Sequence, residues 1–105
     1  MSNLPKLIAS LIEAQNSYDS IKFSNCFAET AIVHDEAHKY IGRNEIKSWI
    51  GGANDTYKTM MRPIEYLTDT QELKAEISGN FPGSPLVLTY QFACKDEQIH
   101  SLRIV

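Results

Sequence analysis

The sequence predicts an α+β domain in which helices come first and an antiparallel sheet follows. Apolar residues near the amino terminus repeat at helical spacing, whereas the second half of the chain alternates apolar and polar residues as strands do. Turn-forming residues separate these alternating runs. A chain of 105 residues supports one hydrophobic core, so we expect a single domain over 1–105 with helices covering one face of the sheet.

The first expected element is an amphipathic helix. Its apolar positions recur at i, i+3, i+4, i+7 and i+8, and they are Leu4, Leu7, Ile8, Leu11 and Ile12. Asn3 is the expected N-cap, with Pro5 in the first turn. Asn16 and Ser17 end this helix. A second, shorter helix then reaches about Ala28, with an apolar side made of Phe23, Cys26 and Phe27.

A short strand pair and a third helix are expected next. Residues 30–35 are β-branched and alternating, and residues 38–41 could return as a second strand before Gly42. The third helix should start at Arg43 or Asn44. Gly51 and Gly52 lie inside its pattern, and each is less favourable there than alanine by about 1 kcal/mol. We therefore expect either a shortened helix or close packing against the two glycines.

The rest of the chain predicts a four-stranded antiparallel meander. The expected strands are 59–68, 73–81, 86–94 and 98–105, joined by turns at 69–71, 82–85 and 95–97. One face of this sheet is apolar and the other is mixed, the latter carrying Val87, Thr89, Gln91 and Ala93. Because no helix is left to cover the mixed face, we expect a homodimer joined through the sheet.

Composition limits the classes of partner. The net charge is −3 and the basic residues are scattered, which argues against nucleic acid as the main partner. The segment MSNLPKLIASLIEAQ predicts neither a signal peptide nor a membrane span. Cys26 and Cys94 form neither a disulfide framework nor a zinc motif, so we expect reduced thiols and a cytoplasmic protein.

The order of elements resembles a known family. Helix, helix, short strand pair, helix and meander, with the segments FAETAIVHDEAHKYIGRNEIKSWI and SGNFPGSPLVLTYQF, resemble the small SnoaL-like proteins of the nuclear transport factor 2-like superfamily. The resemblance implies a cone-shaped fold, with N-terminal helices packed on a curved, mainly antiparallel sheet around an apolar pocket. That superfamily includes ketosteroid isomerase, scytalone dehydratase, polyketide cyclases, limonene epoxide hydrolase and non-catalytic binding or transport proteins.

Asp35 and His34 are the candidate catalytic residues. The segment ending at Asp35 follows the Phe-Ala-x-x-Ala-x-Val-x-Asp pattern, in which the resemblance implies a general base at the last position. In a regular strand His34 and Asp35 point to opposite faces, so at most one of them enters a pocket. The oxyanion-stabilising tyrosine of the isomerases aligns with Leu11, and a replacement could come from Tyr40, Tyr57 or Tyr90.

The environment of Asp35 allows two interpretations. Beside Val33 and an apolar helix, a partly desolvated carboxylate would have a pKa above its ordinary value of about 3.9. Alternatively, Arg43 or Lys39 could pair with Asp35 and lower that pKa, or the residue could simply cap the bend at 34–38. Only the first interpretation gives a base able to take a proton from a carbon next to a carbonyl.

Aromatic residues could form the wall of the pocket. Trp49, the only tryptophan, could stack against a flat ligand or simply seal the third helix onto the sheet. The same alternatives apply to the other expected pocket residues, which are Phe27, Tyr40, Ile50, Tyr57, Phe81, Tyr90 and Phe92.

The segment HDEAH does not predict a metal site. In a strand, His34 and His38 would lie about 13 Å apart, too far to share one ion. We therefore expect a protein that binds a small apolar or aromatic ligand, with no cofactor and no metal. It could be an isomerase, cyclase or hydratase using acid–base chemistry, or a non-catalytic binding or interaction module on the same scaffold.

Overall fold

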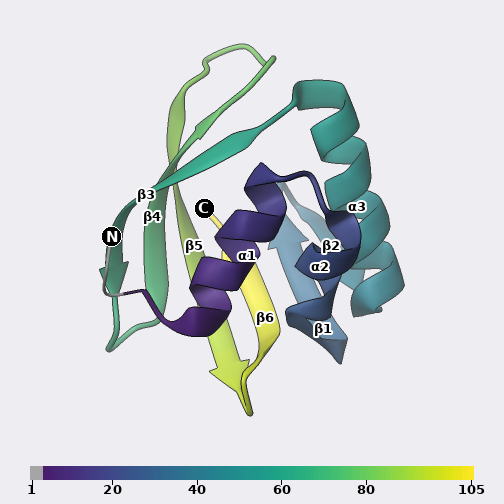
Figure 1. Cartoon of the computed structure of the whole chain (residues 1–105), viewed down its shortest axis with the longest axis vertical. Coiled ribbons are helices and arrows are strands. Elements are labelled where there is room, and N and C mark those ends of the chain that lie inside the picture. Colours follow the sequence, from purple (N-terminus) through teal and green to yellow (C-terminus); the bar gives the residue numbers. More distant parts are fainter. Residues whose placement is uncertain (1–3) are drawn as a thin grey trace.

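The computed structural model describes residues 4–105 as a sheet with three helices on one of its faces (Figure 1). The first half of the chain forms α1 (Lys6–Asn16), α2 (Ser20–Asn25), β1 (Phe27–Asp35), β2 (His38–Ile41) and α3 (Gly42–Tyr57). The second half forms β3 (Met60–Leu67), β4 (Glu72–Ser78), β5 (Leu86–Lys95) and β6 (Gln98–Ile104). The predicted α+β class and the order of its elements are confirmed.

The sheet has six strands in the order β2-β1-β6-β5-β4-β3. Strands β3 to β6 form the predicted antiparallel meander, and β1 pairs antiparallel with β2. The remaining pair, β1 with β6, is parallel and joins the two halves of the chain. Because β1 and β6 are far apart in sequence, this parallel pairing had no local signal in the residues.

Two predicted helix boundaries need correction near the amino terminus. Helix α1 begins at Lys6, directly after Pro5, and the expected N-cap, Asn3, lies outside the described residues. Helix α2 ends at Asn25, so Phe27 and Ala28 belong to β1 and not to a helix. The reason is tertiary: Phe27 pairs with Ile99 of β6, and both side chains are fully buried.

Helix α3 is not shortened at Gly51 and Gly52, one of the two alternatives that the sequence left open. It runs through both of them to Tyr57, and a Cβ at Gly51 would make only ordinary contact with the side chain of Ser20. A Cβ at Gly52 would meet nothing within 4 Å.

Strand β4, in contrast, is shorter than expected and ends at Ser78. The amide of Asn80 donates a 2.6 Å hydrogen bond to the carbonyl of Tyr57, which draws this turn onto the end of α3.

The core lies between the helices and the facing side of the sheet. Its largest fully buried side chains are Phe27, Ile8, Leu11, Ile46, Leu73, Ile99, Leu102 and Val33. Three polar residues, Gln15, Ser24 and Asn54, are buried as well. The Gln15 amide donates to Asn54 Oδ1 at 2.9 Å and to Thr59 Oγ1 at 2.7 Å, tying α1 to the end of α3 and the start of β3. Satisfied buried polar groups of this kind fix how elements meet.

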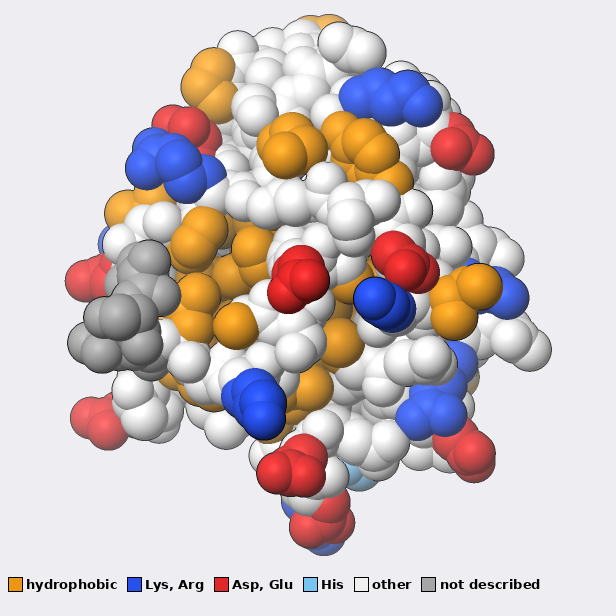
Figure 2. All heavy atoms as spheres, in the orientation of Figure 1, with side chains coloured by type: hydrophobic (Ala, Val, Ile, Leu, Met, Phe, Trp, Pro, Cys, Tyr) orange, Lys and Arg blue, Asp and Glu red, His pale blue; other side chains and the backbone are white. Residues whose placement is uncertain are grey.

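The surface on the helical side has a mixed character (Figure 2). Charged side chains of both signs are scattered over this face, and hydrophobic side chains gather beside α1, over β4 and β5. Among the described residues, no helix is long and apolar enough to cross a bilayer.

The opposite face of the sheet carries no helix and has an ordered distribution of charge. Register places Lys39, His34 and Arg103 side by side on β2, β1 and β6, followed by Gln91 on β5 and Glu72 on β4. We call this the outer face. In this row Lys39 and Arg103 lie toward one edge of the sheet and Glu72 toward the other, and the same face of β4 also carries Lys74. A copy rotated about a central two-fold axis would bring unlike charges together.

The glycines supply a matched pair of stability tests. A Cβ at Gly79 would lie 2.6 Å from the Tyr57 carbonyl oxygen, so Gly79→Ala should lower the free energy of unfolding by about 1–3 kcal/mol. At open helical Gly52, the change to alanine should raise it by up to about 1 kcal/mol. Urea unfolding of both variants checks the signs. A stable Gly79→Ala protein would mean that the turn does not approach α3 this closely.

The homodimer remains a prediction, and the outer face gives it a test. Val87 lies on this face with 58% of its side chain exposed, so Val87→Asp should shift a dimer toward monomer by placing a charge in the contact. Ile21→Asp, at a 61% exposed position on α2, is the matched control and should change nothing. Equilibrium sedimentation at micromolar concentration is the measurement. A wild-type monomer there would contradict the prediction.

Candidate functional site

Asp35 and Tyr90 lie in one cross-strand row on the helix-facing side of the sheet. Val33 pairs with Leu102, which pairs with Phe92, and all three side chains are buried there. Because side chains alternate, Asp35 and Ile104 lie two residues further along on the same face, and Ile104 pairs with Tyr90. One strand thus separates Asp35 from Tyr90, a Cα separation of about 10 Å.

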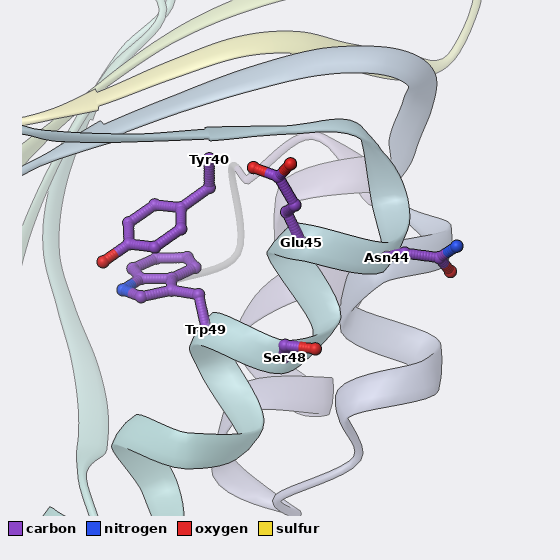
Figure 3. Close-up of a pocket in the computed structure, with 5 residues that line it drawn as sticks. All are labelled: Tyr40, Asn44, Glu45, Ser48 and Trp49. Atoms are coloured by element: carbon purple, nitrogen blue, oxygen red, sulfur yellow. The ribbon is translucent and has the colours of Figure 1, made fainter.

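Trp49 approaches Asp35 from α3. Its ring stacks on Tyr40 of β2 with centroids 5.2 Å apart and planes at 24°, and its edge meets Phe23 of α2 at 6.1 Å. Figure 3 shows the Tyr40 hydroxyl and the Trp49 indole nitrogen at the same end of the stack. The indole N–H faces Asp35 and favours the ionised form of its carboxyl. Trp49 is only partly buried, so it is both a packing residue and part of the surface around Asp35.

The half-buried Asp35 carboxyl has a raised pKa. Burial is the main cause and the nearby Glu36 carboxylate adds to it, while the indole N–H of Trp49 and the proximity of His38 act in the opposite direction. Neither ion pair found within residues 4–105 involves Asp35. Arg43, one of the two expected partners, donates its Nε hydrogen to the Phe27 carbonyl at 2.7 Å instead. The expected direction of the pKa shift is confirmed.

Tyr90 is 93% buried, since 7% of its surface is exposed. Its pKa is raised, first by burial and then by the charge of Asp35, so the hydroxyl keeps its proton at neutral pH. Every fully enclosed side-chain nitrogen or oxygen among the described residues has a hydrogen-bond partner. The Tyr90 hydroxyl makes no hydrogen bond within that part of the chain, so it must still touch open space.

Tyr40 brings a second hydroxyl to the same cluster. Burial, Asp35 and Glu36, in that order, raise its pKa. The response of both tyrosines to the charge of Asp35 indicates that the carboxylate lies near each of them. We call Asp35, Trp49, Tyr40 and Tyr90 the acid–tyrosine cluster. It combines a carboxylate able to accept a proton with two hydroxyls able to donate hydrogen bonds.

The other expected site residues lie elsewhere. Phe27, Ile50 and Phe92 are buried in the core. Tyr57 and Phe81 contact each other edge to face at 6.2 Å, and Tyr57 lies about two turns beyond Trp49 on α3. Neither belongs to the acid–tyrosine cluster.

His34 points to the outer face, where Lys39 and Arg103 flank it. Its side chain therefore leaves the sheet on the side opposite Asp35, as strand alternation requires. Of the two candidate catalytic residues, only Asp35 belongs to the acid–tyrosine cluster.

Two open grooves border this region. The first, of about 460 Å³, is lined by Tyr40, Asn44, Glu45, Ser48 and Trp49 (Figure 3). The second, of about 380 Å³, follows the turn between β1 and β2 and is bordered by both candidate catalytic residues, His34 and Asp35, together with His38 and the end of β6. The sequence did not single out Asn44, Glu45 or Ser48. Their only signal was a polar helix face, which usually means solvent.

No family model and no curated protein matches the sequence. Among solved structures, a protein from Sinorhizobium meliloti described as a candidate polyketide cyclase is 33% identical, with a TM-score of 0.93, over 99% of this chain and 97% of that one. A protein from Catenulispora acidiphila with a ketosteroid isomerase-like fold, in complex with trimethylamine, has a TM-score of 0.85 at 16% identity, over 98% and 86% of the two chains.

SalBIII, described as an epoxide hydrolase/cyclase-like enzyme in pyran ring formation in salinomycin, has a TM-score of 0.72 at 16% identity, over 94% of this chain and 86% of that one. At these low identities, SalBIII and the Catenulispora protein share only the fold with this chain. The Sinorhizobium protein is similar enough to share the family. Together with the helices on a six-stranded sheet, the comparisons place this chain among the SnoaL-like proteins of the nuclear transport factor 2-like superfamily.

Proposed function

We propose that the protein binds a small apolar or aromatic molecule and moves a proton on it by general acid–base catalysis without a cofactor. Asp35 is the proton acceptor in this proposal, and Tyr90 and Tyr40 are hydrogen-bond donors. Trp49 packs against the ligand and orients the Asp35 carboxylate through its indole N–H.

One observation carries the proposal. A half-buried carboxylate that belongs to neither ion pair of residues 4–105 shares a sheet face with a buried tyrosine whose hydroxyl makes no hydrogen bond there. Such an arrangement is unfavourable for stability, because burying an unpaired carboxylate removes its hydration. Groups of this kind concentrate at sites that act on ligands.

The chemistry that fits is proton transfer next to a carbonyl. The Asp35 carboxylate takes a proton from a carbon beside the carbonyl; the C–H electron pair forms a C=C bond and the π pair of the carbonyl moves to its oxygen. A tyrosine hydroxyl then stabilises the enolate oxygen by hydrogen bonding. In a substrate with a C=C bond next to that carbon, the enolate is a dienolate, and returning the same proton from Asp35 to its far carbon completes an isomerisation, so no other reactant is consumed.

The structural relatives support a small-molecule site and leave its chemistry open. Their descriptions include a polyketide cyclase, an epoxide hydrolase/cyclase-like enzyme and a protein in complex with trimethylamine. A second candidate is a non-catalytic binding or interaction module on the same scaffold. The openness of both grooves and the filled core around Phe27, Ile50 and Phe92 favour that alternative.

We also propose a cytoplasmic location. Cys26 and Cys94 are both free thiols, which supports a reducing compartment.

Replacing Asp35 tests the proposed reaction. We expect the wild-type protein to accelerate hydrogen–deuterium exchange at the α-carbon of a flat ketone such as 2-tetralone, followed by NMR in D₂O. Asp35→Asn should reduce that acceleration by about 100-fold or more. The wild-type rate should rise with pH through the raised pKa of Asp35 and then level off. Glu29→Gln, at an exposed carboxylate on the same strand, is the control.

Saturable binding of 2-tetralone without exchange would favour the non-catalytic alternative. Exchange that survives Asp35→Asn would mean that another group is the base. Native mass spectrometry of the protein taken from cells, looking for a co-purified apolar molecule, would identify the ligand class in either case.

The stability of Asp35→Asn follows from the same pKa. The folded state holds the proton more tightly than the unfolded state, so ionisation of Asp35 destabilises the fold. This penalty is absent below the ordinary pKa of 3.8 and fully present above the raised value.

At pH 7 Asp35→Asn should therefore be as stable as wild type, or more stable by up to about 1 kcal/mol. The difference should vanish as the pH falls toward 3.8. Urea unfolding at pH 7 and at acid pH measures it. A variant clearly less stable than wild type at pH 7 would indicate a structural aspartate.

Trp49→Phe separates the two roles of the indole. Phenylalanine keeps an aromatic ring beside Tyr40 but removes the N–H donor, which now favours the ionised form of Asp35. The pKa of Asp35 should rise further, as measured by carbon-detected NMR titration of its carboxyl. An unchanged or lower pKa would mean that the indole makes no hydrogen bond to Asp35 in solution.

A further inference from the structure

The first groove has a chemical character of its own. It lies between β2 and α3, with the stacked rings of Tyr40 and Trp49 on one side and the Glu45 side chain on the other (Figure 3). Asn44 and Ser48 complete its lining. The groove therefore combines an aromatic wall with a carboxylate and two neutral polar groups.

The Glu45 carboxylate is held in place at the groove. Its Oε1 accepts a hydrogen bond from the amide of Ile41 at 2.9 Å. Neither ion pair within residues 4–105 involves Glu45. This bond caps the start of α3 and leaves the second carboxylate oxygen, Oε2, free to face a ligand in the groove.

Within residues 4–105, Glu45 is the one charged residue in the lining of the groove. No lysine, arginine or histidine is among the residues that line it. The charges of Asp35 and Glu36 both act on the Tyr40 side chain, so further negative potential reaches the aromatic wall. The adjacent Arg43 is occupied by the Phe27 carbonyl.

We propose that this groove binds the cationic head of an organic ammonium ligand, with the alkylated nitrogen against the Tyr40 and Trp49 rings and beside Glu45. Aromatic rings attract alkylammonium groups, and a carboxylate adds charge attraction. This inference rests on the proposed function in that the same two rings flank Asp35. It goes further by assigning a positive charge to the ligand.

An isosteric pair of probes tests the charge directly. Choline and 3,3-dimethylbutan-1-ol have nearly the same shape, and only choline is charged. Trp49 is the single tryptophan, so its fluorescence reports binding at the groove itself. At constant ionic strength we expect choline to change Trp49 emission in a saturable way. The neutral alcohol should bind more weakly by about tenfold or more.

Glu45→Gln keeps an acceptor for the Ile41 amide and removes the charge, so it should weaken choline binding by about fivefold. Glu97→Gln, in the turn after β5, is the matched control and should leave choline binding unchanged. Three results would each overturn the inference: equal affinity for the two probes, no binding of choline, or an affinity for choline that is the same in Glu45→Gln as in wild type. Ketone exchange that depends on Asp35 would still stand in those cases, because that assay uses a neutral molecule.

Discussion

The parallel pairing of β1 with β6 is the constraint on which the rest of the structure depends. It attaches the strand pair and α3 to the side of a meander that the chain completes only at its end. Val33 and Leu102, both fully buried, are paired across this junction. Without it, Asp35 and Tyr90 would belong to separate substructures. With it, they lie in one row on the side of the sheet that the helices cover.

That pairing creates an electrostatic conflict at Asp35. The end of β1 is placed under α3, where the carboxylate loses hydration, and Arg43 is turned away to the Phe27 carbonyl. Only Trp49 and His38 offset the effect of burial. A structural role would be better served by a neutral residue, since an unpaired half-buried charge opposes folding. The conflict is easier to understand if a ligand uses the carboxylate, because sites of action commonly keep groups that stability alone would remove.

Local pattern explains why the elements could be predicted and part of the site could not. Helical and strand periodicities are properties of neighbouring residues, so helices, strands and turns appeared in the right order. The assignment of Phe27 and Ala28 failed because their strand exists only by pairing with β6. Alternation also told which residues share a face, and so separated His34 from Asp35.

Local patterns give no information on which positions of distant helices, turns and strands come together, and Tyr57 lies on α3 while Phe81 lies in the turn after β4. That is why Tyr57 and Phe81 could not be distinguished from Tyr40 and Tyr90 as pocket residues in the sequence. Glu45 could not be predicted as a groove residue for a different reason. On the polar side of a helix, a residue that faces a groove has the same pattern as one that faces water.

Leu11 determines how this cluster must differ from the isomerases that its sequence resembles. Leu11 is fully buried and apolar at the position where the resemblance implies an oxyanion-stabilising tyrosine, so α1 offers no donor there. The donors must come from Tyr40 or Tyr90, on opposite sides of Asp35. Tyr40 borders an open groove at the edge of the sheet, whereas Tyr90 is buried and lines neither groove. A ligand held by Tyr40 can remain at the surface, and its charged head can stay in the groove beside Glu45. Using Tyr90 requires a slim apolar part that reaches past Ile104. Such a ligand would be elongated, with its reacting carbon between a polar end outside and an apolar end inside.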